Sequence, residues 1–169
     1  MKNVLIIDNQ PISRIGIKAL ININYKDWNL FDAGRLETFL LQNKMIEPAL
    51  VLLSLDFELY DPDVDQIKRI KKQYPEAAII ILGAMACKNT IFSLFAEGIQ
   101  GYVSKLETEN ELLECLEQVV HHRKYISTNH LESLLPNVLD LKDGHSLRKP
   151  FLSFPTILPF IQNETAPCF

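Results

Sequence analysis

Polar side chains stand at the ends of the most apolar stretches of this sequence. Asp8 and Asn9 follow NVLII, and Lys105 follows GYVS. Ser54 and Asp56 end the stretch ALVLLSLD. Carboxylate oxygens are hard ligands of the kind that Mg²⁺ takes, whereas a serine hydroxyl is a weak nucleophile unless a base lies beside it. The chemistry of these strand ends therefore depends on whether Ser54 or Asp56 is the central residue.

The apolar stretches themselves indicate strands that are covered on both faces. Runs that are apolar at nearly every position are typical of a parallel sheet between layers of helices. The predicted strands cover residues 3–8, 28–33, 49–55, 77–84 and 101–104. Ligands of an open parallel sheet bind beyond the carboxyl ends of its strands, so we expect the polar residues named above to lie at that edge.

Segments with helical periodicity separate the predicted strands. The predicted helices cover residues 11–21, 35–43, 63–74, 89–98 and 109–122. The first helix carries five apolar residues mostly on one stripe, which we expect to face the core: Ile12, Ile15, Ile17, Leu20 and Ile21. Gly98 is expected to follow the end of the fourth helix. This alternation predicts one α/β domain, a doubly wound (βα)5 fold with a five-stranded parallel sheet, over residues 1–123.

The composition indicates a soluble globular protein of 169 residues, with 47% hydrophobic and 22% charged residues. The net charge of −4 gives no overall attraction for nucleic acid. Three cysteines without a metal-binding or disulfide spacing favour a reducing compartment. The sequence contains no signal peptide pattern and no apolar run of membrane length, so we expect a cytoplasmic protein without membrane contact.

The pattern changes after the predicted domain. Residues 124–138 are predicted to form a linker helix, with Pro136 breaking it. Residues 139–169 form a tail that is too interrupted by proline for a helix and rich in large apolar side chains. We expect this tail to dock on its own domain or on another chain, unless it is the relic of a truncated gene.

Four stretches of the chain resemble the receiver domain of bacterial response regulators of the NarL/LuxR type. They are VLIIDNQPISRIGIKALI, PALVLLSLD, AEGIQGYVSKLETENELLECLEQVV and KYISTNHLESLL, within residues 2–138. The resemblance implies a flavodoxin-like or CheY-like fold. It also implies a site with two acids that bind Mg²⁺, an aspartate that accepts a phosphoryl group, a Ser or Thr, a Lys and a switch aromatic residue.

The chain departs from that pattern at three positions. Asn9 replaces the second acid, Ser54 stands at the phospho-acceptor position, and Gly83 replaces the hydroxyl residue, so the acidic pocket is degenerate. Asp8, Lys105 and the switch-like aromatic Tyr102 match the pattern. Loss of two carboxylates weakens Mg²⁺ binding and removes the main stabilisation of the transferred phosphoryl group.

An alternative register makes Asp56 the acceptor. Ser54 and Asp56 are two residues apart and would point to the same side of a strand. The apolar run LVLL ends directly before Ser54, which favours Ser54 as the equivalent and places Asp56 in the following loop. Under the favoured register we expect no cofactor, no bound metal and an ion pair between Asp8 and Lys105. Under the alternative, Asp8 and Asp56 bind Mg²⁺ weakly.

These features predict a pseudo-receiver, a protein-interaction or dimerisation module in bacterial signal transduction or transcription regulation that is not an enzyme. The expected partner is a second copy or another response regulator, bound through the first and fifth helices or through a face that carries Phe92, Phe95, Tyr102 and Leu112. Proteins of this type usually carry a helix-turn-helix domain after the linker helix. The tail has no such pattern, so direct DNA binding by this chain alone is not expected. The alternatives are a functional phospho-receiver that uses Asp56 and a truncated LuxR-type DNA-binding regulator.

Overall fold

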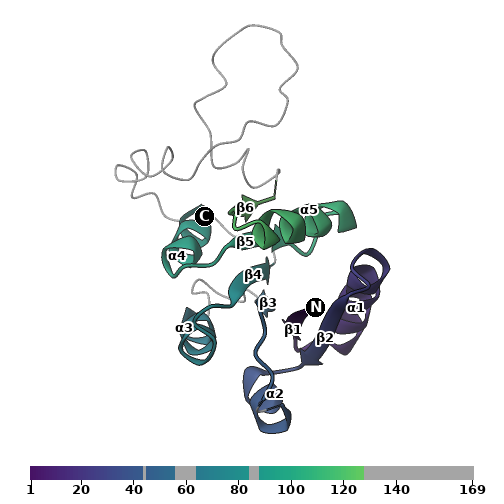
Figure 1. The fold of residues 1–169 in the computed structure, drawn as a ribbon. Helices are drawn as coiled ribbons and strands as arrows, with labels where there is room; N and C mark the ends of the chain where they lie inside the picture. The colour runs from purple at the N-terminus through teal and green to yellow at the C-terminus, as the bar shows by residue number, and fades with distance from the viewer. Residues whose placement is uncertain (44, 56–63, 84–87, 128–169) are drawn as a thin grey trace, which may run out of the picture.

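A six-stranded parallel sheet forms the centre of the molecule (Figure 1). The structure is a computed structural model, and it describes residues 1–43, 45–55, 64–83 and 88–127. The strand order is β2-β1-β3-β4-β5-β6. The strands are β1 (Lys2–Ile7), β2 (Trp28–Ala33), β3 (Leu50–Leu55), β4 (Ala78–Gly83), β5 (Gly101–Ser104) and β6 (Tyr125–Ile126).

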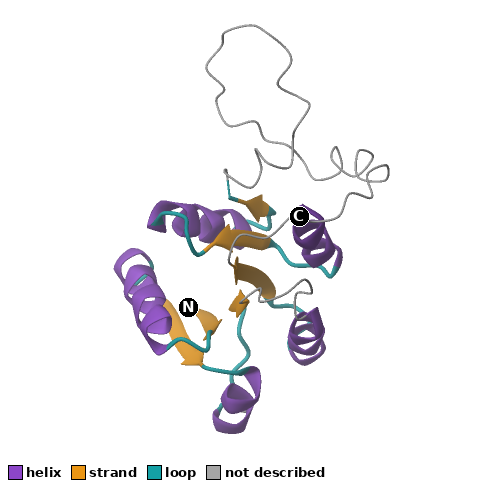
Figure 2. Ribbon diagram, turned by 180° about the vertical axis from the view of Figure 1, so that it is seen from behind, coloured by secondary structure: helices purple, strands orange, loops and turns teal. Residues whose placement is uncertain are grey.

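Helices cover both faces of the sheet. Within the described ranges they are α1 (Pro11–Asn24), α2 (Leu36–Gln42), α3 (Val64–Gln73), α4 (Lys88–Ala96) and α5 (Glu109–Val120). Helices α1 and α5 lie on one face, and α2, α3 and α4 lie on the other (Figures 1 and 2). This arrangement confirms the predicted doubly wound α/β fold, and the five predicted strands are all present. None of the helices in the described ranges has the length and apolarity that a membrane span requires.

The sheet has one strand more than the sequence predicted. β6 pairs with β5 in parallel, with Gly101 opposite Tyr125 and Tyr102 opposite Ile126. The sheet therefore continues past residue 123, into the start of the segment predicted as a linker helix. Two residues are too few to give a periodic pattern. Residues 128–138 of that linker and the whole tail lie outside the described residues.

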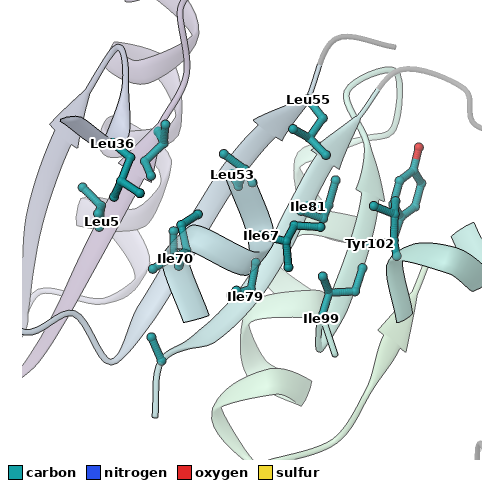
Figure 3. Close-up of a cluster of buried hydrophobic side chains, with 14 of the residues drawn as sticks. Leu5, Leu36, Leu53, Leu55, Ile67, Ile70, Ile79, Ile81, Ile99 and Tyr102 are labelled. Carbon is teal, nitrogen blue, oxygen red and sulfur yellow. The ribbon is translucent and has the colours of Figure 1, made fainter. Parts of the chain in front are cut away.

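The core consists of two layers of apolar side chains, one on each face of the sheet. Along β1, Val4 and Ile6 face α1 and α5, whereas Leu5 and Ile7 face the other three helices. Figure 3 shows the second layer, where side chains of the strands meet those of α3 and the buried ring of Tyr102. Burying each large apolar side chain stabilises the fold by about 1.5–3 kcal/mol, so the central strands are held from both faces of the sheet.

The predicted inward stripe of the first helix is only partly correct. Ile21 is fully buried, but Ile12 is 85% exposed and Ile15 is 68% exposed. On a helix with 100° between residues, Ile12 points away from Ile21, and Ile15 lies far from it too. The prediction was wrong for these two side chains because their apolarity was taken as a sign of burial.

The end of α4 follows the prediction for Gly98. Its φ of 87° is in the left-handed region that favours glycine. The Gly98 N–H donates to the Phe95 carbonyl at 3.0 Å, and the Ile99 N–H donates to the Leu94 carbonyl at 3.4 Å. These two bonds form a Schellman motif, which ends the helix and directs the chain into β5.

Candidate functional site

Strand pairing brings the ends of β1, β3, β4 and β5 to one edge of the sheet. Ile7 pairs with Leu53, so Asp8 follows β1 at the level of Ser54 in β3. Gly83 pairs with Ser104, and the Lys105 N–H donates to the Gly83 carbonyl at 2.7 Å. Asp8, Ser54 and Lys105 therefore meet where ligands of parallel sheets bind.

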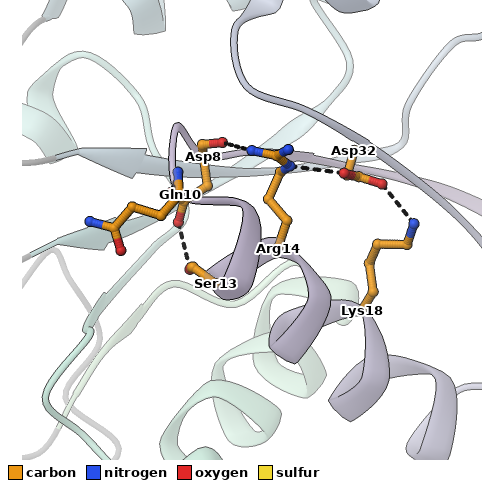
Figure 4. A network of polar contacts seen from close by, with 6 residues as sticks. All are labelled: Asp8, Gln10, Ser13, Arg14, Lys18 and Asp32. Carbon is orange, nitrogen blue, oxygen red and sulfur yellow. Dashed lines mark hydrogen bonds and ion pairs between the residues drawn. The ribbon is translucent and has the colours of Figure 1, made fainter.

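The Asp8 carboxylate is 1% exposed and is bound by its own chain (Figure 4). One oxygen accepts the Gln10 backbone N–H at 2.7 Å, and the other accepts the Ser13 hydroxyl at 2.7 Å. Burial acts to raise the pKa of Asp8, but the bonds from Ser13 and Gln10, helped by Ser54 and Lys105, outweigh it and lower the pKa. Asp8 is therefore held as an anion.

Lys105 lies beside this anion. Its Nζ is 3.7 Å from the Asp8 carboxylate oxygen that also accepts the Ser13 hydroxyl. The expected ion pair is thus present, at a distance that gives a looser contact than the two hydrogen bonds. The lysine side chain is largely buried, and its positive charge at this distance neutralises part of the negative charge of Asp8.

Ser54 lies close to Asp8 without a hydrogen bond. Its hydroxyl is near enough to help lower the pKa of Asp8, although the two groups do not meet the geometric criteria of a hydrogen bond. The Oγ atom is buried and has no hydrogen-bond partner among the described residues. Asp56 lies outside the described residues, so the alternative register stays a prediction.

A second polar network fixes the start of α1. The Arg14 Nε donates to Asp32 at 2.9 Å, and its Nη1 donates to the Asp8 carbonyl at 2.6 Å (Figure 4). The Lys18 Nζ donates to the other Asp32 oxygen at 2.6 Å. The Lys18 bond, and then that of Arg14, lower the pKa of Asp32 against the effect of its partial burial. The network joins α1 to the ends of β1 and β2.

The sequence analysis did not identify Ser13 and Arg14 as site residues. Both lie in the first turns of α1, directly after the Asp8 loop, and only the packing of that helix against the strands shows that they reach Asp8 and Asp32. Pro11 at the start of the helix was the available signal, because it places the following residues in the first helical turns next to the strand end.

The remaining site residues differ in exposure. Asn9 is exposed, and Gly83 is buried at the end of β4. Tyr102 is fully buried (Figure 3). Within the described ranges no three His, Cys, Asp or Glu side chains gather as a metal ion would require.

The residues named for the predicted interaction face are mostly not exposed, and whether this face binds a partner stays a prediction. Phe95, Tyr102 and Leu112 are buried in the two core layers, and Phe92 is half-buried against one of them. They pack inside the chain because α4 and α5 lie directly on the sheet. These side chains help to hold α4 and α5 on the sheet.

Comparisons with known proteins agree with this fold. No model of a protein family matches the sequence. The Transcriptional regulatory protein MctR of Rhizobium johnstonii is 26% identical over 132 residues, which are 78% of this chain and 61% of that protein. The Nitrate/nitrite response regulator protein homolog of Haemophilus influenzae is 26% identical over 124 residues, 73% of this chain and 59% of that protein. The chain thus spans about three fifths of the length of these relatives.

Solved structures give the same picture. The isolated REC domain of RcsB from Salmonella enterica serovar Typhimurium superposes with a TM-score of 0.69 at 20% identity, covering 79% of this chain and 98% of that chain. A LuxR family two-component response regulator from Aurantimonas sp. SI85-9A1 gives a TM-score of 0.67 at 22% identity, covering 80% and 96%. The described part of the chain therefore has the fold of a receiver domain, similar to the receivers of LuxR-type response regulators.

Proposed function

We propose that this chain is a pseudo-receiver, a receiver domain that acts through protein contacts without aspartyl phosphorylation. The proposal rests on which residue lies beside Asp8 at the end of β3 and on the groups that already bind Asp8. Ser54 lies beside Asp8 at the end of β3, and the Asp8 carboxylate is already bound by Gln10, Ser13 and Lys105.

The described strand ends offer fewer negative charges than phosphoryl transfer requires. Mg²⁺ needs a near-octahedral set of oxygen ligands, usually with more than one carboxylate or phosphate oxygen. Among the described strand ends Asp8 supplies the carboxylate, while Asn9 and Ser54 supply neutral oxygens. Without a firmly bound metal, the negative charge of the transferred group has little to stabilise it.

Ser54 is also a poor nucleophile for phosphoryl transfer. An aspartate attacks as an anion, but a serine hydroxyl must lose a proton to a neighbouring base. Asp8 is the neighbouring carboxylate, and its lowered pKa makes it a poor base. Ser54 is therefore not expected to take up a phosphoryl group.

Beryllofluoride binding tests this part of the proposal. The wild-type chain with Mg²⁺ is expected to give no saturable protein-bound resonance in ¹⁹F NMR. The matched variant Asn9→Asp/Ser54→Asp/Gly83→Thr restores the missing groups and is expected to gain one. If the wild-type chain binds beryllofluoride and Asp56→Asn abolishes the binding, the chain is a phospho-receiver that uses Asp56.

The contact surface that we propose is the outer side of α1. Ile12, Ile15 and Ile23 are 85%, 68% and 71% exposed, and the exposed Gly16 and Ala19 lie between them. We call these five residues the α1 stripe. Their spacing places them on one side of the helix. Contiguous exposed apolar side chains mark contact sites, and the small residues allow a close approach.

The proposed partner is a second copy of the chain or another response regulator. Sedimentation of the wild-type chain over a concentration series is expected to show self-association that Ile15→Glu weakens at least tenfold. Leu41→Glu is the matched control, because Leu41 is as exposed but lies on α2. A chain that stays monomeric and retains no response regulator in pull-down experiments would refute this contact surface.

A further inference from the structure

A cavity of about 300 Å³ lies between the start of α1, the start of α5 and the ends of β4 and β5. Its volume is at the lower end of the range for ligand pockets, so it suits one or two side chains better than a large molecule. Apolar side chains from four different elements line it: Ile17, Leu82, Val103 and Leu112. The cavity is separate from the outward-facing α1 stripe.

Charged and polar groups surround the apolar lining. Ser13 and Lys105, which both contact Asp8, line the cavity next to the acidic site. Glu107 and Glu109 line it at the beginning of α5, which makes this side acidic. An occupant that fits both features carries a large apolar group directly next to positive charge.

The chain contains such a segment outside the described residues. Arg148 and Lys149 are followed by Pro150 and then by Phe151 and Leu152. We propose that residues 148–152 bind in this cavity of their own chain, with an apolar side chain of the segment on the lining and its two cations near Glu107 and Glu109.

The covalent connection makes this docking feasible. Residues 128–150 separate the end of the described sheet from Phe151, and a segment of about 23 residues reaches as far as about 75 Å when extended. A domain of this size has a radius of gyration of about 14 Å, so the cavity is within reach. A covalent connection of this length gives an effective concentration on the order of millimolar, so modest intrinsic affinity is sufficient.

Pro150 also favours the bound form. Proline fixes its own φ, and it restricts the residue before it to extended conformations. The segment therefore loses less conformational entropy on binding than a flexible one would. A second copy of the chain could present the same residues, which the experiment must distinguish.

Limited proteolysis of the full chain with chymotrypsin tests the proposal, because cleavage follows the accessible population of each bond. The Phe151–Leu152 bond is expected to be cut at least about tenfold more slowly in the wild-type chain than in a free peptide of the same sequence. The Phe160–Ile161 bond lies outside the proposed segment and serves as the internal reference.

Charge reversal identifies the binding site. The double variant Arg148→Glu/Lys149→Glu is expected to be cut at Phe151–Leu152 as fast as a free peptide of the variant sequence. Adding Glu107→Lys/Glu109→Lys to this variant is expected to restore the protection. Lys142→Glu is the matched control in the tail and is expected to leave the protection unchanged. Cleavage of the wild-type Phe151–Leu152 bond at the peptide rate, or protection that survives the reversal, would overturn the proposal.

Dilution separates the chain's own segment from that of a second copy. Protection by its own segment stays constant over a hundredfold dilution, whereas loss of protection on dilution would assign the cavity to a second copy and overturn the proposal. The readout does not involve phosphoryl transfer, so it can fail or succeed independently of the proposed function.

Discussion

Replacing Gly101 with alanine tests how closely α5 packs on the sheet. Gly101 begins β5 under the middle of α5. A Cβ atom at this position would lie 2.6 Å from the Cys115 Sγ, 3.0 Å from the Ile80 Cγ1 and 3.3 Å from the Val119 Cγ2. All three neighbours are in the core layer between the sheet and α1 and α5. Cys115 and Val119 belong to α5 and cannot move outward without lifting the helix, and Ile80 is fixed in the neighbouring strand β4.

The magnitude follows from two opposing effects. Overpacking a closely packed core by one methyl group costs about 1–3 kcal/mol. Alanine in a strand is favoured over glycine by about 0.5–1 kcal/mol, because glycine loses more conformational entropy when the chain folds. Gly101→Ala is therefore expected to lower the free energy of unfolding by about 1–2 kcal/mol.

Urea denaturation followed by circular dichroism measures this change, and a double-mutant cycle assigns its cause. Cys115→Ala removes the atom at 2.6 Å and alone costs about 1 kcal/mol for the cavity that it leaves. In that background Gly101→Ala is expected to cost less, with a coupling energy on the order of 1 kcal/mol. Gly16→Ala is the matched control. No atom lies within 4 Å of a Cβ there, and the change is expected to stabilise α1 by about 0.5–1 kcal/mol.

Two results would refute this reasoning. If Gly101→Ala is as favourable as Gly16→Ala, α5 does not lie as close to β5 as the structure has it. If Gly101→Ala is destabilising but shows no coupling to Cys115→Ala, the strain arises elsewhere than at the sulfur.

Three further substitutions test the site and the turns, each measured by urea denaturation. Asp8→Asn is expected to lower stability at neutral pH by about 1.5–3 kcal/mol, because it removes the anion that three groups bind. The pKa of Asp8 is lowered on folding, so the carboxylate contributes to stability above the unfolded pKa near 3.8. This contribution is lost as the pH falls through the lower pKa of the folded state. A destabilisation by Asp8→Asn that grows in acid would contradict this. Gly98→Ala is expected to cost about 1–2 kcal/mol, since alanine rarely adopts a φ of 87°. Asp32→Asn is expected to cost about 1 kcal/mol or less, because its pairs are partly exposed, and the cost should shrink at 1 M salt.

The sheet could be predicted from the sequence because burial on both faces leaves an unambiguous apolar run. Each predicted strand is present within about one residue of its bounds. The two-residue strand β6 carries no such run, and it forms because the chain after α5 returns to the free edge of β5. Local patterns cannot show which edges a sheet leaves open.

Side-chain direction was the harder problem for the helices and for the site. The apolarity of Ile12 suggested burial, but its side chain is exposed, whereas Phe95, expected on an interaction face, is buried. The convergence of Asp8 and Lys105 could be predicted because the carboxyl ends of parallel strands lie at one edge of the sheet. The bond from Ser13 to Asp8 depends on the position of α1 over the end of β1, which only the three-dimensional packing fixes.

Helix α1 connects the acidic site to the proposed contact surface, and this connection has a measurable consequence. Ser13 binds the Asp8 carboxylate and Arg14 binds the Asp8 carbonyl, one or two residues before the exposed Ile15. A ligand shifts an equilibrium between two states only through different affinities for them. Under the proposed function these bonds hold the start of α1 in one arrangement. Because the site does not bind a phosphoryl group, such a group cannot favour a second arrangement. The dissociation constant of self-association is therefore expected to be the same with and without Mg²⁺ and beryllofluoride, as measured by sedimentation. In the variant with Asn9→Asp, Ser54→Asp and Gly83→Thr, the dissociation constant is expected to change when Mg²⁺ and beryllofluoride are added. A wild-type chain whose dissociation constant changes in the same way would show that its site still switches.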